Sequence, residues 1–430
     1  TLAPNSTTGT VMSTTDNRIT GCVNTDTCEW IYGDGATPTV RAHTANGSNN
    51  FFVSWSSPTE CTAYGLGSFC QVTMNGHKTV SANYQGAGTN RAFVTSTYVR
   101  ANVGLSGFDS LCNATATDAG INNTSNNGYV AWVSGSTAAA ASRWTSSGAL
   151  VRLDGRVFAR SRSELLANNI RHPLHLDEFG RKVGGDESVW TGTAPDGGIG
   201  PRTCENWTRG FNDGGTADGM ERGIANGGPA HWTMRDGSHS CGSATTRVLC
   251  FENKSSANTI AASSFPNGGL RIFRTGLVSM PSGVTGADST CASQAAAAGL
   301  PGTYRAYISS TTRTAASVVS DTGMYYRVDG SFVGVGTQLK TNPTTLASGI
   351  WHYATGVPVL PGGTNDVVPT WTGAASPALL GTATSTCSNW TSSTSTGFRG
   401  WSLTAAPNFF NSYGATACSS SNGLYCVQQP

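Results

Sequence analysis

The chain has 430 residues, and at roughly 100–200 residues per domain this length predicts two to four domains. Only 12% of the residues are charged and the net charge is +2, which argues against the strongly basic character of nucleic-acid binders. No stretch of about 18 consecutive apolar residues occurs, so we expect no membrane span.

The twelve cysteines form an even set, without Cys-x-x-Cys pairs or the Cys/His spacing of zinc fingers. We therefore expect six disulfides and an oxidising, extracellular location that is reached by secretion. Residues 1–4 look like the start of a mature chain whose leader has been removed.

Residues 1–88 contain short runs of alternating apolar and polar side chains. The alternation in residues 70–74 and 79–84 predicts paired strands, and hence a small all-β or β-rich N-terminal domain. Residues 1–8 are polar, and we expect them to have no fold of their own and to be able to add to the sheet edge of a neighbour.

The same segment contains several short motifs that can be compared with known modules. They are 9–11, Cys22, Cys28, 39–40, 52–55, Cys61, 70–74 and 80–84. In these residues the segment resembles the divergent bacterial repeat related to internalin-type B repeats. The resemblance implies a stalk or spacer of a surface protein, in which Cys22–Cys28 and Cys61–Cys70 would be local bridges.

The rest of the chain is organised by an internal repeat. Six landmarks recur in the same order: 104–112 with 283–291, 131–134 with 306–309, 152–155 with 327–330, 189–192 with 370–373, 204–208 with 387–391, and the closing cysteines Cys241 and Cys250 with Cys418 and Cys426. We therefore predict two homologous domains, a first copy at residues 91–253 and a second copy at residues 270–427. Residues 254–269 are small and polar, and we expect them to be a linker.

Within the second copy, one helix is expected over residues 291–298, with Asp288 as its cap and Gly299 as its stop. Short strands are expected at 304–309 and 325–328, followed by a turn at Asp329 and Gly330 and a returning strand. The first copy repeats this hairpin. These elements predict an α+β fold with mostly short strands and long loops.

Several segments of the two copies match a known extracellular pattern, namely 283–288 and 298–310 in the second copy and 188–190, 195–197, 204–207 and 248–253 in the first. In these segments the copies resemble endostatin and a bacterial secreted domain family of unknown function. The resemblance covers about three quarters of the chain. It implies two tandem C-type-lectin-like (endostatin-like) domains with nested disulfides, which would be Cys112–Cys250, Cys204–Cys241, Cys291–Cys426 and Cys387–Cys418. The sequence alone leaves three connectivities open in each domain.

The ligand sites of these families have few counterparts here. The triplets that serve calcium-dependent sugar binding are absent from both copies. Asp213, Asp218 and Glu221 are weak calcium candidates, but their Gly-rich stretch lacks the spacing of a calcium loop, which favours a surface turn.

Two further groups of polar residues in the first copy are candidate sites. His172 and His175 could share a metal on a helix, but the proline between them favours an extended loop on a polar surface. The arginines could form an anion-binding face, although an ordinary solvated surface is the favoured interpretation; they are Arg152, Arg156, Arg160 and Arg162.

The residues that recur between the copies are core and turn types rather than catalytic types. Trp190, Trp207, Trp371 and Trp390 are therefore expected to be core anchors and not sugar platforms. No nucleophile elbow, zinc-protease motif or phosphate loop occurs in the sequence. We expect no enzymatic activity and no cofactor.

The leading functional hypothesis is a non-enzymatic extracellular structural or adhesive protein at the cell surface, either a fibre subunit or an adhesin. Its partners would be further copies of the chain, associated head to tail, or a glycan or protein on a host or cell surface. The alternative is a soluble secreted module that binds a glycan or a protein. A secreted hydrolase is the least favoured hypothesis.

Overall fold

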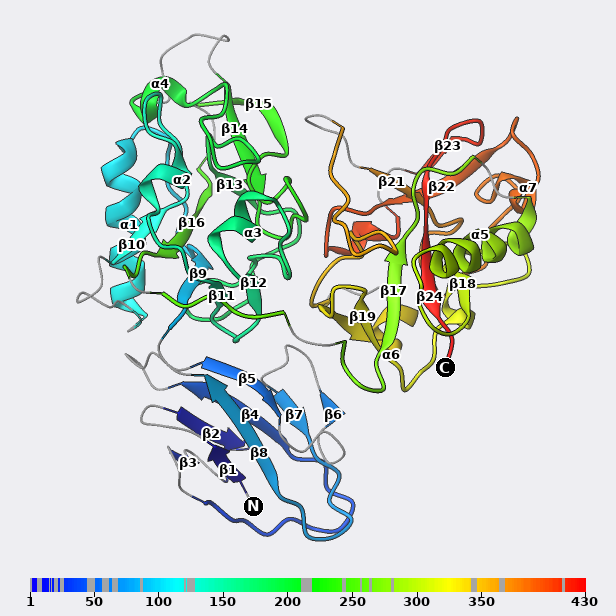
Figure 1. The fold of residues 1–430 in the computed structure, drawn as a ribbon, viewed down its shortest axis with the longest axis horizontal. Helices are drawn as coiled ribbons and strands as arrows, with labels where there is room; N and C mark the ends of the chain where they lie inside the picture. The colour runs from blue at the N-terminus through cyan, green and yellow to red at the C-terminus, as the bar shows by residue number, and fades with distance from the viewer. Residues whose placement is uncertain are drawn as a thin grey trace.

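The computed structural model consists of an N-terminal β-domain and the two copies, which lie side by side (Figure 1). It describes residues 2–430 except for 6–9, 15, 17, 19–21, 24–26, 45–50, 56–61, 64–68, 86–87, 120, 122–127, 210–218, 242–244, 256, 263–264, 280–281, 342–345, 363–367 and 412–413. None of the helices in this described part has the length and apolar character that crossing a membrane requires.

The N-terminal domain contains two sheets whose facing sides form one small core. The first sheet has the order β1 (Leu2–Asn5), β8 (Val80–Gln85), β5 (Phe51–Trp55). The second has the order β3 (Cys22–Val23), β2 (Thr10–Thr14), β4 (Thr39–Thr44), β7 (Phe69–Gln71), β6 (Thr62–Ala63). Side chains of both sheets meet in the core, among them Met12, Val40 and Ala82. The strands predicted around residues 70–74 and 79–84 are present as β7 and β8.

The N-terminal strand is not free to complete a neighbour's sheet. β1 pairs in parallel with β8 of its own domain, and Leu2 lies opposite Val80. The expectation that residues 1–8 have no fold of their own is therefore wrong for Leu2–Asn5, because the edge of β8 offers these residues backbone hydrogen bonds within the same domain.

The two copies have the same strand order. The sheet of the first copy is β12 (Val157–Ala159), β11 (Leu150–Arg152), β9 (Asn90–Val94), β16 (Arg247–Glu252), β13 (Ser188–Trp190), β14 (Gly219–Ile224), β15 (Asp236–Ser240), with β10 (Tyr129–Ala131) on β16. The sheet of the second is β20 (Phe332–Val335), β19 (Met324–Arg327), β17 (Leu270–Arg274), β24 (Gly423–Gln428), β21 (Pro369–Trp371), β22 (Thr396–Trp401), β23 (Ala415–Ala417), with β18 (Tyr304–Ala306) on β24. The order matches strand for strand, as expected for two copies of one ancestral unit.

Each copy contains one long helix, α1 (Gly104–Asp118) or α5 (Gly283–Ala297). The remaining helices are short: α2 (Ala140–Arg143), α3 (Arg162–Leu166), α4 (Cys204–Trp207), α6 (Gly336–Lys340), α7 (Cys387–Trp390), η1 (Ala315–Val318) and η2 (Pro407–Phe409).

The start of α5 was predicted wrongly and its end correctly. Asp288 lies inside α5, where its carboxylate accepts a hydrogen bond from the backbone N–H of Ala306 instead of capping the helix. Gly299 follows the last turn with a φ of 67°, which favours glycine and ends the helix.

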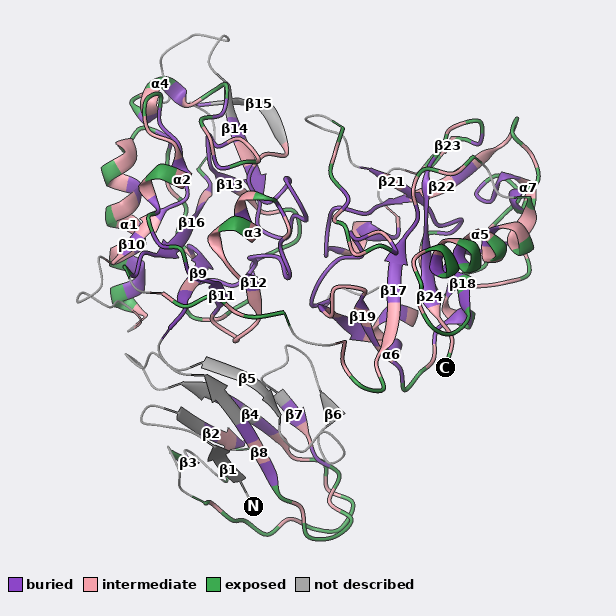
Figure 2. Cartoon of the chain, viewed as in Figure 1, coloured by how far each residue is buried: buried purple, intermediate pink, exposed green. Residues whose placement is uncertain are grey.

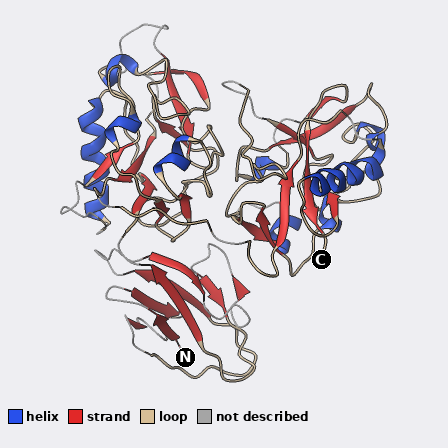
Figure 3. Cartoon of the chain, in the orientation of Figure 1, coloured by secondary structure: helices blue, strands red, loops and turns tan. Residues whose placement is uncertain are grey.

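The predicted fold class is wrong. We expected an α+β fold with tandem C-type-lectin-like domains, but the described part of the chain is rich in sheet, with more strand than helix, and the tandem C-type-lectin arrangement is not found (Figure 3). The physical reason is that the long segments rich in Thr, Ser and Gly contribute short strands and turns to the sheets. The motifs that resemble endostatin contain cysteines and tryptophans of the core. Such residues identify equivalent positions in two proteins, but they do not determine how much of the chain between them forms sheet.

Five of the six predicted disulfides are present in the structure. They are Cys22–Cys28, Cys112–Cys250, Cys204–Cys241, Cys291–Cys426 and Cys387–Cys418. The pair Cys61–Cys70 involves Cys61, which lies outside the described residues. Multiple disulfides suggest an extracellular or secreted protein.

The short elements α4 and α7 are left-handed turns. The four residues of α4 have φ between 48° and 63°, and those of α7 between 51° and 67°. L-amino acids lose about 1–2 kcal/mol per residue in this conformation, so neighbouring contacts must offset the cost. In α4 the indole N–H of Trp207 donates to the carbonyl of Ser134, and Asn206 Oδ1 accepts from the backbone N–H of Ser136. In α7, Trp390 and Asn389 make the equivalent bonds to Ser309 and Thr311.

Removal of the disulfide that holds α4, by the double substitution Cys204→Ser and Cys241→Ser, is expected to destabilise the first copy by about 2–5 kcal/mol. The bridge restricts the unfolded chain and also holds one residue of the left-handed turn. Denaturant unfolding of both forms measures the difference. The Cys22–Cys28 disulfide closes a much shorter loop, so its removal by Cys22→Ser with Cys28→Ser should cost less stability. An equal or larger loss of stability for this second variant would contradict the ranking.

The two copies share one apolar core across the seam between them. Trp351, Trp401 and Leu403 of the second copy belong to the same buried cluster as Trp232 and Ile224 of the first. The segment predicted to be a linker contacts both sides. The backbone N–H of Ile260 donates to the carbonyl of Arg160 in the first copy, and the ring of Phe265 packs against Tyr326 in the second.

The seam has the contact pattern of a two-fold axis. In the strand register, Trp190 lies opposite Arg222 in the first copy, and Trp371 lies opposite Arg399 in the second. Gly227 and Thr404 follow these two arginines by the same number of residues, so they occupy equivalent positions in the two copies. Gly227 and Thr404 form an antiparallel bridge with each other. The hydrogen bonds around them are reciprocal: Gly228 N–H donates to Leu403, and Ala405 N–H donates to Asn226. Equivalent residues that contact each other reciprocally define a closed, self-complementary interface.

Candidate functional site

An open pocket of about 580 Å³ lies at the outer end of the N-terminal domain. Two segments form it, and together they are called the tip below: residues 29–31, which follow the Cys22–Cys28 disulfide, and residues 74–78, which join β7 to β8. Figure 1 places these loops on the side of the domain that faces away from the two copies, and Figure 2 shows that exposed residues gather there.

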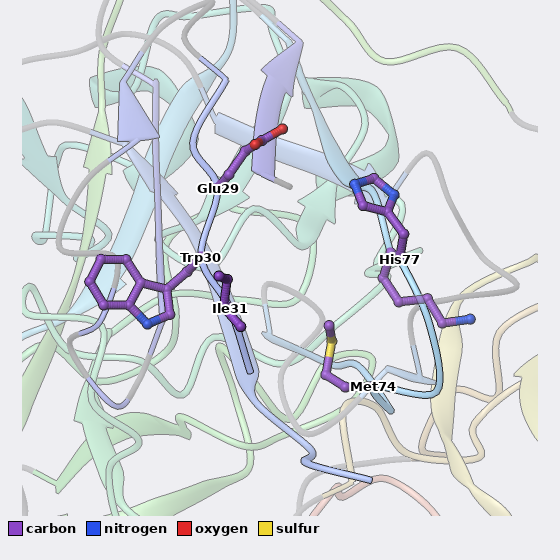
Figure 4. Close-up of a pocket in the computed structure, with 6 residues that line it drawn as sticks. Glu29, Trp30, Ile31, Met74 and His77 are labelled. Carbon is purple, nitrogen blue, oxygen red and sulfur yellow. The ribbon is translucent and has the colours of Figure 1, made fainter. Parts of the chain in front are cut away.

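The side chains of the tip form an apolar centre with a polar rim. Figure 4 shows Ile31 and Met74 between Trp30 on one side and His77 on the other, with Glu29 at the edge. Lys78 completes the lining. The side chain of Trp30 is 53% exposed and that of Ile31 is 88% exposed. Two large apolar side chains that stand exposed beside a pocket are typical of an interaction site, since water is a poor environment for them.

Backbone hydrogen bonds hold the residues that follow the first segment of the tip against its second segment. Gly35 N–H donates to the carbonyl of Met74, and Met74 N–H donates to the carbonyl of Ala36. The hydroxyl of Tyr32 donates to Asp16 Oδ1 and anchors the first segment from its other side. The tip is therefore pre-organised, and a partner would not have to order it on binding.

The chemistry of the tip suits binding rather than bond cleavage. Its lining offers an indole, an isoleucine and a thioether for apolar contact, with one carboxylate, one imidazole and one ammonium group at the rim. Across the described ranges, no three His, Cys, Asp or Glu side chains come together as metal ligands.

A second concentration of functional groups lies buried at the seam. The carboxylate of Asp329 accepts from Arg327 and, across the seam, from Arg171; each distance to Asp329 Oδ2 is 2.8 Å. Arg171 also contacts Glu164 Oε1 at 2.5 Å. Burial by itself would raise the pKa of Asp329, but Arg327 and Arg171 hold it well below the ordinary value. The network is therefore ionised and ties the two copies together.

Three histidines are buried in or beside this network. His352 Nε2 donates to Asn169 Oδ1 across the seam at 3.1 Å. His172 Nδ1 donates to the carbonyl of Val157, and His175 Nε2 accepts from Arg152. Burial lowers the pKa of His352 to about 3 and holds the pKa values of His172 and His175 well below normal, with further lowering from the surrounding arginines. All three are neutral in the folded chain.

The arginines of the possible anion-binding face have partners within the protein, and the ordinary solvated surface that was favoured for them is wrong for the buried Arg152. Arg152 is buried and pairs with Asp154 at 2.5 Å, and Arg156 lies 3.6 Å from the same carboxylate. Arg160 pairs with Glu164, and Arg162 donates to backbone carbonyls. The motif Arg-x-Asp-Gly occurs at residues 152–155 and again at 327–330. In both places its arginine pairs with its own aspartate, so the motif indicates an internal ion pair rather than a basic surface.

The other candidate sites have separate outcomes. Asp213 and Asp218 lie outside the described residues, so the structure does not test the calcium candidates as a group; Glu221 is buried within β14, where the register with β15 shifts. The polar surface expected at His172 and His175 is wrong, since both side chains are buried. The predicted core anchors are confirmed: Trp190, Trp207, Trp371 and Trp390 are fully buried.

The tip was missed by sequence reasoning. Trp30 was not distinguished from the buried tryptophans, because one sequence gives no measure of exposure for a single aromatic residue. The available signal was the pair Trp30–Ile31, two large apolar residues directly after the short loop that the Cys22–Cys28 disulfide closes. Comparison of the sequence with protein-family models gives no match, and comparison with curated proteins gives none either.

Proposed function

We propose that the chain is a non-enzymatic extracellular structural or adhesive protein, a fibre subunit or an adhesin, which contacts its partner through the tip. The exposed Trp30–Ile31 pair beside the open pocket carries this proposal. In support, the tip is held by backbone hydrogen bonds, lies at one end of the molecule, and belongs to a chain with few charges and several disulfides.

The test compares the full chain with the double variant Trp30→Ser and Ile31→Ser. We expect the wild type to form assemblies visible by electron microscopy or to bind surfaces that carry its partner, and the variant to lose this by about a hundredfold, because each large apolar side chain contributes about 1.5–3 kcal/mol when buried. The matched control is Val357→Ser, which removes an exposed apolar side chain of the second copy. A variant that assembles and binds like the wild type would exclude the tip as the contact surface.

The second candidate is a soluble secreted module that binds a glycan or a protein. The observation in its favour is the exposed indole of Trp30 next to the polar groups of Glu29 and Lys78, a combination on which a sugar ring could stack while its hydroxyl groups are hydrogen-bonded. A glycan array separates the candidates. A soluble lectin-type module binds a defined sugar as a monomer and changes the fluorescence of Trp30, whereas a fibre subunit associates without added glycan.

A further inference from the structure

We propose that Leu379 and Leu380 of one molecule dock against the tip of a second copy of this chain, so that molecules associate head to tail. This inference rests on the proposed function and names the partner of the tip.

Adjacent exposed apolar side chains occur at two places among the described large hydrophobic residues. One is the Trp30–Ile31 pair of the tip. The other is Leu379–Leu380, where each side chain is 53% exposed, in the loop between β21 and α7. In the first copy the equivalent place has the single exposed residue Ile199. The leucine pair is therefore a feature of the second copy alone.

The two pairs lie at opposite ends of the molecule. The tip faces away from both copies, and Figure 1 shows β21 and α7 in the half of the second copy that is turned away from the N-terminal domain. Surfaces at opposite ends cannot meet within one molecule. A contact between them therefore joins different molecules and leaves one surface free at each end of the assembly.

The leucine loop, like the tip, is held by hydrogen bonds to the rest of its domain. Ser309 Oγ donates to the carbonyl of Leu379, and the backbone N–H of Gly381 donates to the carbonyl of Ser310. The N–H of Leu379 is bonded to the carbonyl of Ser376. Two preformed loops lose little conformational entropy when they meet.

The charge distribution favours this occupant of the pocket. No charged residue occurs between Trp371 and Arg399, so the leucine loop brings no charge that would have to be desolvated. The charged groups of the tip, Glu29 and Lys78, belong to the lining of its pocket, and neither residue is buried. They can stay in contact with water while the leucines cover the apolar centre.

The seam between the two copies is not available as the contact between successive molecules. Its reciprocal contacts around Gly227 and Thr404 are satisfied within one molecule, and a self-complementary interface closes on itself. Extension of an assembly therefore requires another surface, which the tip and the leucine pair provide.

The experiment uses two double variants of the full chain: Trp30→Ser with Ile31→Ser, and Leu379→Ser with Leu380→Ser. Neither variant should associate with itself, and the association constant of each should fall by about a hundredfold relative to the wild type. Each retains one intact surface, so a mixture of the two should form a one-to-one complex that grows no further. Light scattering with size exclusion measures the masses, and Ile199→Ser is the control that should assemble like the wild type.

The outcomes separate this inference from the proposed function. If the leucine variant assembles like the wild type, or if the mixture forms no complex, the docking of the leucines is refuted while a structural or adhesive role stands. If Ile199→Ser is as damaging as the leucine variant, the assignment to the second copy is wrong. A wild-type chain that neither associates nor binds any surface refutes the proposed function itself. Melting curves that match the wild type show that each variant is folded.

Discussion

Asp329→Ala is expected to destabilise the chain by about 3–5 kcal/mol, the usual loss when one partner of a buried ion pair is removed. The carboxylate is the shared acceptor of Arg327 and Arg171, and the side chains of both arginines are almost fully buried. Without Asp329, Arg327 remains beside Trp351 and the seam with no compensating carboxylate in contact. Urea unfolding of the full chain measures the loss.

Two variants serve as controls for this prediction. Asp16→Ala removes one partner of the exposed pair with Arg18, and pairs of this kind contribute only about 0–1 kcal/mol. Asp329→Asn keeps the shape and one of the two acceptor oxygens but removes the charge, so its loss should lie between those of Asp16→Ala and Asp329→Ala. A loss below about 1 kcal/mol for Asp329→Ala would mean that water enters the seam and that the network is not a buried one.

Part of this architecture was predictable from the sequence. The recurrence of Cys, Trp and Asp-Gly positions predicted the repeat and the burial of Trp207 and Trp390, because these residues anchor each copy in the same way. The seam was not predictable. Arg171 and Asp329 are 158 residues apart, and nothing in their local sequence indicates that they meet.

The errors share a physical cause. Burial and partners decide the role of a polar side chain, and both depend on tertiary contacts. Arg152 looks like a surface cation in the sequence but pairs internally with Asp154, and His172 looks like a polar surface residue but lies beneath arginines of both copies. The left-handed turns at α4 and α7 were missed for a related reason. Their residues favour right-handed conformations locally, and the disulfides and indole hydrogen bonds override that preference.

Acidification below about pH 6.5 is expected to destabilise this protein. His172, His175 and His352 have depressed pKa values in the folded chain, and that of His352 is about 3. In the unfolded chain each should titrate near its ordinary value of about 6.5. Between these values the unfolded state binds more protons than the folded state, so the free energy of unfolding falls as the pH falls.

The pH window identifies the histidines as the cause. The pKa values of Asp329 and Glu164 are also lowered by their arginines, so these carboxylates destabilise the fold on acidification as well, but only below their ordinary values near 4. Between about pH 6.5 and 4.5 the slope therefore comes from the histidines. Each proton that only the unfolded chain binds adds about 1.4 kcal/mol of lost stability per pH unit.

Denaturant unfolding of the full chain at several pH values in this window tests the prediction, and His352→Gln should reduce the slope. Glutamine can still donate to Asn169 but does not titrate, so the variant separates the loss of the hydrogen bond from the loss of the titrating group. The control is His77→Gln at the exposed tip, which should leave the slope unchanged. Stability that stays constant from about pH 6.5 to 4.5 would contradict the burial of neutral histidines. A slope that His77→Gln reduces as much as His352→Gln would place the titrating group at the tip, away from the seam.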